Sequence, residues 1–90
     1  LIFFMDINQL INIIQKKIQN NINITELKIE DKSFLHKKHK NFSLDKFHIK
    51  IKIQSDELNN LSKIDATRKL HALLKVEIKN NIHSLEILFS

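Results

Sequence analysis

This chain of 90 residues contains no cysteine, no glycine and no proline. The lack of cysteine excludes disulfides, zinc knuckles and thiol nucleophiles, and leaves the redox compartment open. The lack of glycine excludes phosphate-binding loops of Walker and Rossmann type, and the glycine-containing loop with which KH modules hold a nucleic-acid backbone. Turns must be built from Asn, Asp, Ser and Lys, and metal chemistry falls mainly to the five histidines.

The length predicts one small domain, residues 1–90, with a single core, because a chain of this size buries roughly 60–65% of its unfolded surface. The apolar residues 1–5 are far fewer than the roughly 20 that span a bilayer. They also lack the charged lead and the cleavage site of a signal peptide. We therefore expect a cytoplasmic protein with no membrane contact, in which residues 1–5 are an N-terminal extension or Met5 is an alternative start.

The excess positive charge is confined to one segment. Residues 28–52 contain eight lysines and three acidic residues, whereas the rest of the chain has seven basic and seven acidic residues, so this segment carries the net charge of +5. It also holds three histidines, which add charge in mild acid. The pattern fits a solvated lysine-rich hairpin, and it equally fits a surface for nucleic acid, an acidic protein or an anionic cofactor.

Helical periodicity predicts two main helices. The first begins after Asp6, a capping residue, and runs to about Asn20. The second is predicted after a short turn at 55–61, begins at Ser62 and ends near Lys79. Its outer side carries a basic stripe, made of Arg68, His71, Lys75 and Lys79.

Alternating apolar and polar residues predict three strands, at 24–31, 47–54 and 82–89, and the aperiodic residues 32–43 predict a loop. The second strand directs His48, Lys50 and Lys52 to a wet face. The third is expected to place His83 on one face with Leu85, Ile87 and Phe89. The predicted fold is α+β, a two-layer αββ(α)αβ sandwich in which a three-stranded mixed sheet has its helices on one face.

Connection rules predict where the histidines lie. The first two strands pair antiparallel across their loop, and the helical crossover returns the third strand parallel to the second. The third strand then starts at the sheet edge where the first strand ends and the loop begins. His83 with His36 or His39 becomes a convergent pair at that edge. The plainer interpretation makes His83 a histidine at the edge of the core, bonded to backbone, and makes His36 and His39 solvated loop residues.

Four short stretches, in their order and spacing, resemble the BolA family. Residues 48–51 resemble its His-Phe-Lys-Val strand, and residues 82–85 resemble its Val-His-Ala-Leu strand. Between them, Ser55 and Asp56 match its Ser-Asp turn, and upstream, residues 27–33 look like its first strand and exit. The resemblance covers about two thirds of the chain and implies a fold similar to the second KH type.

The chain also departs from the family pattern. Where the family usually has Arg-His-Arg, this chain has Ala66, Thr67 and Arg68. We also expect no helix after the last strand, where the family often has one. Partner or DNA binding that depends on the Arg-His-Arg cluster is therefore less expected than binding at the histidine edge.

The resemblance implies that the chain is not an enzyme, is a monomer alone, and forms a heterodimer with a monothiol glutaredoxin that shares a [2Fe-2S] cluster. His36 lies where family members carry a loop His or Cys. The implied ligands are His83 and His36, with His39 as competitor for the second position, and the partner supplies a cysteine and glutathione. A chain without thiols offers such a cluster imidazole ligands.

A second hypothesis is a nucleic-acid-binding regulator, with DNA as partner. It uses basic side chains of the second helix and the second strand, namely Arg68, Lys75, Lys79, Lys50 and Lys52. Lysine contacts to phosphate would make the affinity fall steeply with salt. The missing glycine-rich clamp and the lack of an aromatic platform on the wet face of the second strand argue against it.

Overall fold

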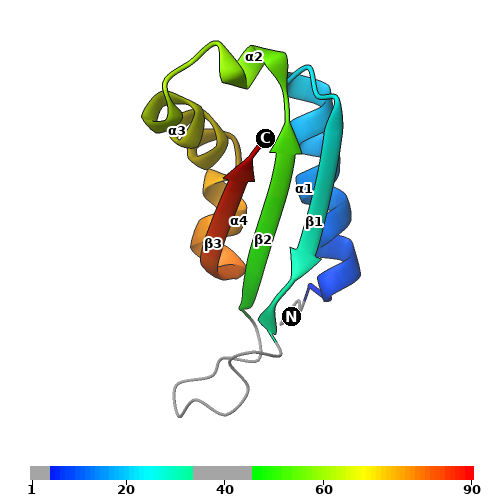
Figure 1. Cartoon of the computed structure of the whole chain (residues 1–90). Coiled ribbons are helices and arrows are strands. Elements are labelled where there is room, and N and C mark those ends of the chain that lie inside the picture. The colour runs from blue at the N-terminus through cyan, green and yellow to red at the C-terminus, as the bar shows by residue number, and fades with distance from the viewer. Residues whose placement is uncertain (1–4, 34–45) are drawn as a thin grey trace.

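The computed structural model describes residues 5–33 and 46–90, which form one three-stranded sheet and four helices. The predicted α+β class is confirmed. Figure 1 shows the helices in a layer behind the sheet. The elements are α1 Ile7–Asn21, β1 Glu26–Asp31, β2 Phe47–Gln54, α2 Asp56–Asn59, α3 Lys63–Leu73, α4 Lys75–Asn80 and β3 Ile82–Phe89.

The sheet has the predicted topology. Its strand order is β1-β2-β3, with β1 antiparallel and β3 parallel to β2. Asp31, the last residue of β1, pairs with Ile49 near the start of β2, and Phe47 pairs with Ile82 at the start of β3. The end of β1 and the starts of β2 and β3 therefore share one edge of the sheet, at the bottom of Figure 1.

The helix starts follow the predicted caps. Asp6 and Gln9 form a reciprocal capping box on α1, in which the Gln9 N–H donates to Asp6 Oδ1 over 2.8 Å and the Asp6 N–H donates to Gln9 Oε1 over 3.0 Å. Ser62 caps α3, since its Oγ accepts the Asp65 N–H over 3.0 Å. These side chains satisfy backbone donors that have no partner within the helix.

The prediction of one continuous second helix is wrong. The chain leaves helical geometry at Leu74, whose φ of −101° and ψ of 19° separate α3 from α4. Leu74 is fully buried and still accepts the Ile78 N–H, so the bend keeps this side chain in the core. Apolar spacing carries no signal for it, because the same residues would line one face of a straight helix.

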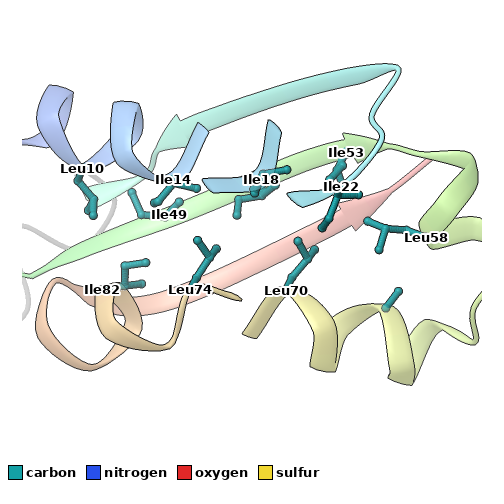
Figure 2. Close-up of a cluster of buried hydrophobic side chains, with 12 residues drawn as sticks. Leu10, Ile14, Ile18, Ile22, Ile49, Ile53, Leu58, Leu70, Leu74 and Ile82 are labelled. Carbon is teal, nitrogen blue, oxygen red and sulfur yellow. The ribbon is translucent and has the colours of Figure 1, made fainter. Parts of the chain in front are cut away.

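The core lies between the helices and one face of the sheet. Ile49, Ile51 and Ile53 of β2 are at most 2% exposed, and α1 and α3 pack against them (Figure 2). The core residues from the helices are Leu10, Ile14 and Ile18 of α1, Leu58 of α2, and Ala66 and Leu70 of α3. The opposite face of β2, which carries His48, Lys50 and Lys52, is left uncovered by helices; we call it the open face.

One ion pair joins α1 to α4 within the helical layer. Lys17 Nζ lies 2.8 Å from both carboxylate oxygens of Glu77. The Glu77 side chain is only 7% exposed and that of Lys17 is 35% exposed. The pair therefore places a nearly buried carboxylate against a half-solvated ammonium.

Within the described residues, no helix has the length and apolar character needed to cross a membrane.

Candidate histidine site at the sheet edge

A register shift between β2 and β3 determines where His83 points. Phe47 pairs with Ile82, but the next residue of β2, His48, pairs with Ser84, so His83 is an extra residue in β3. Ile82 is buried in the core, whereas His83 and Ser84 are both exposed. An extra residue of this kind interrupts strand alternation and re-aims a side chain.

The prediction that His83 shares the face of Leu85, Ile87 and Phe89 is therefore wrong. Those three residues are half-buried against the core, whereas His83 is exposed. Strand alternation predicts the face only while the register is regular. The exposure of His83 also argues against its interpretation as a core-edge histidine, and leaves its imidazole accessible to a partner.

His48 lies beside His83. Their ring centroids are 4.9 Å apart and the ring planes are tilted by 57°. His48 Nδ1 is 2.6 Å from Ser84 Oγ, a hydrogen bond whose direction depends on the tautomer of the ring. Although His48 lies on the open face as predicted, it is only 9% exposed. Sequence reasoning missed this pair, because the cross-strand register that creates it is not readable from alternation.

The chain at the end of β1 is hydrogen-bonded to the backbone of His48. Ser33 Oγ accepts the backbone N–H of His48 over 3.0 Å, and the Lys32 N–H donates to the His48 carbonyl over 2.7 Å. Asp31 Oδ1 in turn accepts the Ser33 N–H over 2.9 Å. The chain therefore leaves β1 beside the backbone of His48 in β2, at the same end of the sheet as His83 in β3.

The residues that follow Ser33 include two of the predicted ligands. His36 and His39 lie outside the described residues, so their convergence with His83 stays a prediction. In the described ranges, 5–33 and 46–90, no group of three or more His, Asp or Glu side chains is arranged to hold a metal ion. The described part of the chain thus offers the accessible imidazole of His83, which suits a metal centre only if other ligands join it.

The charges on the open face form a network of ion pairs. Glu30 of β1 contacts Lys32 at 2.8 Å, Lys52 at 3.1 Å and Lys28 at 3.5 Å. The hydrogen bonds from Lys32 and then Lys52 lower the pKa of Glu30 from 4.5 to about 2, against a smaller opposing effect of burial. This carboxylate therefore stays ionised well into the acidic range.

The basic residues predicted to contact nucleic acid lie on two faces. Lys50 pairs with Glu86 at 3.7 Å and Lys52 pairs with Glu30, both on the open face. Arg68, Lys75 and Lys79 are exposed on α3 and α4, in the layer behind the sheet (Figure 1). Arg68 lies 3.8 Å from Asp65. The helix and sheet cations therefore do not form one continuous surface.

Comparisons with known proteins agree on one family. The model of the family described as BolA-like protein matches residues 18–89. Two solved structures from Arabidopsis thaliana, the BolA domain of SufE1 and BolA1, each share 28% sequence identity with this chain. Each superposes with a TM-score of 0.75, covering 88% of this chain and 87% of the other. No curated protein matches the sequence.

Proposed function

The chain belongs to the BolA family, and from this premise we propose that it binds a monothiol glutaredoxin in the cytoplasm and shares a [2Fe-2S] cluster with it through histidine ligands. The role would be binding, in iron–sulfur cluster assembly, trafficking or iron and redox signalling, and not catalysis. The observation that supports this most directly is the exposed His83, turned out of the core at the edge where the chain leaves β1.

The donor set agrees with a cluster shared between two proteins. A two-iron cluster needs four protein or cofactor ligands, and its usual ligands are thiolates. This chain has none, so it would contribute imidazoles, and the glutaredoxin cysteine and glutathione would contribute the thiolates. When bound, the cluster supplies one-electron chemistry and transferable iron and sulfide, and imidazole ligands raise its potential. A protonated histidine cannot ligate, so acid should weaken the complex.

The second ligand would come from the chain that follows Ser33. A residue three positions beyond Ser33 has its Cα within about 11 Å of the Ser33 Cα, and one six positions beyond has its Cα within about 22 Å. Since Ser33 Oγ accepts the backbone N–H of His48, whose ring contacts that of His83, both limits allow ligation beside His83. We keep His36 as the second ligand, at the position where family members carry a loop His or Cys, and His39 as its competitor.

The test combines the protein with a monothiol glutaredoxin, glutathione, iron and sulfide, and follows visible circular dichroism. The wild type should give a heterocomplex cluster spectrum that differs from that of the glutaredoxin alone. His83→Ala should lose it, and His36→Ala should alter it more than His39→Ala. The matched control is His71→Ala, which removes an exposed helical histidine. A wild-type spectrum from His83→Ala would show that His83 is not a ligand.

A nucleic-acid-binding regulator remains the second candidate, because Arg68, Lys75 and Lys79 are all exposed on the helical layer. The ion pairs of Lys50 and Lys52 on the opposite face reduce its support. A gel shift with duplex and single-stranded DNA across a salt series tests it, with Lys75→Ala/Lys79→Ala as the variant. Absence of binding at low salt would eliminate this candidate.

A further inference from the structure

We infer that His48 is a positioning residue for His83: its buried ring, held in place by the strands around it, keeps the exposed His83 imidazole in one orientation toward the partner. This inference rests on the proposed function, in which His83 binds the shared cluster. It adds a role for a histidine that strand alternation placed only on the wet face of the second strand.

The contact between the two rings has the geometry of a tilted aromatic pair. The ring centroids are 4.9 Å apart, within the roughly 4.5–7 Å of favourable aromatic pairs, and the ring planes are tilted by 57°. The register shift creates this contact. It pairs His48 with Ser84 and turns the extra residue, His83, to the open side of the sheet. With a regular register, His83 would share the face of Leu85, and the two rings would lie on opposite faces of the sheet.

The two rings differ in how firmly they are held. His48 is 9% exposed, its Nδ1 is hydrogen-bonded to Ser84 Oγ, and its backbone N–H is bonded to Ser33 Oγ. His83 is exposed at the end of the sheet. An exposed side chain loses rotamer freedom when it binds, and a neighbour that already restricts it reduces that cost. His48 is thus the fixed ring against which His83 is oriented.

Substitution of His48 should therefore leave His83 able to bind the cluster but less restricted in its orientation. Residues that orient a metal ligand typically change affinity by 10–100-fold when substituted. Since the contact between His48 and His83 is one between their rings, we expect an effect near the lower end, about a tenfold faster release of the cluster. The heterocomplex should still form.

The experiment compares His48→Ala, His48→Phe and the control His71→Ala. In the protein alone, NMR should show that His48→Ala removes the ring-current shift of the His83 ring protons and that His48→Phe restores part of it. In the glutaredoxin heterocomplex, His48→Ala should broaden the electron paramagnetic resonance signal of the reduced cluster and speed its release to a chelator about tenfold. His48→Phe should move both readouts back toward wild type, because an aromatic ring remains beside His83.

Ser84→Ala keeps the test decisive if His48→Ala fails to fold. It removes the hydrogen bond to His48 Nδ1 and leaves both rings, so a smaller change in the same direction is expected. If the folded variants give wild-type resonance signals and release rates, the inference is overturned and the proposed function stands. If the wild type itself forms no heterocomplex cluster, or if His83→Ala retains the wild-type cluster, both are overturned.

Discussion

The pair between Lys17 of α1 and Glu77 of α4 yields a quantitative prediction for stability. Lys17→Met removes the ammonium and leaves the Glu77 carboxylate, 7% exposed, without its partner. Loss of one member of a fully buried pair costs roughly 3–5 kcal/mol. Because the Lys17 side chain is 35% exposed, water can reach this position, and we expect a smaller loss in the free energy of unfolding, about 2–3 kcal/mol.

The double variant Lys17→Met/Glu77→Gln separates the buried charge from the packing. It removes both charges and keeps side chains of similar length, so most of the lost stability should return. The matched control is Lys16→Met, which replaces the neighbouring lysine, exposed on the same helix, and should change stability by less than about 0.5 kcal/mol.

Urea unfolding followed by far-ultraviolet circular dichroism measures these differences, since the chain has neither tryptophan nor tyrosine for fluorescence. In thermal scans the Lys17→Met loss corresponds to about 10–15 °C in Tm for a domain of this size. If Lys17→Met loses less than about 0.5 kcal/mol, or if the double variant is as unstable as the single one, an unpaired buried carboxylate is not what destabilises the protein.

Three further outcomes are expected from other contacts. The pKa of Glu30 is lowered from 4.5 to about 2, so its ion pairs stabilise the fold above pH 4.5 and lose that effect as the pH falls toward 2. Glu30→Gln should flatten the dependence of the free energy of unfolding on pH in this range, and an unchanged dependence would show that the Glu30 ion pairs do not stabilise the fold. Ser55 is 1% exposed, and its hydroxyl accepts the Leu58 N–H and donates to the Asn23 carbonyl, so Ser55→Ala should lower the free energy of unfolding in urea by about 2 kcal/mol. Ser62→Ala removes an exposed cap and should lower it by about 1 kcal/mol, and equal losses would contradict the role of burial. Leu70→Ala should cost about 2–5 kcal/mol, because Leu70 is fully buried in the core, and a loss below 1 kcal/mol would show that the core closes around the gap.

Local signals were sufficient for most of the secondary structure. Asp6 and Ser62 cap helices at the positions that the sequence predicted from their side chains and from the apolar periodicity that follows. The alternation of residues 47–54 matches β2. The connection rules then predicted the strand order and the shared edge, because an antiparallel pair followed by a right-handed crossover leaves few arrangements. The resemblance to the BolA family rested on residues 27–33, 48–51, 55–56 and 82–85, all of which the family model includes.

The sequence by itself thus determined most of the elements, the pairing of the strands and the end of the sheet where His83 lies, since these depend on period and chain direction. Only the tertiary structure decided the bend at Leu74, the Lys17–Glu77 pair and the side chain contacts of His83. Each of these depends on how two elements fit together: one extra residue in β3 reverses the face of His83 and brings it to His48. Periodicity describes each strand separately, and a shift in register is a property of the pair.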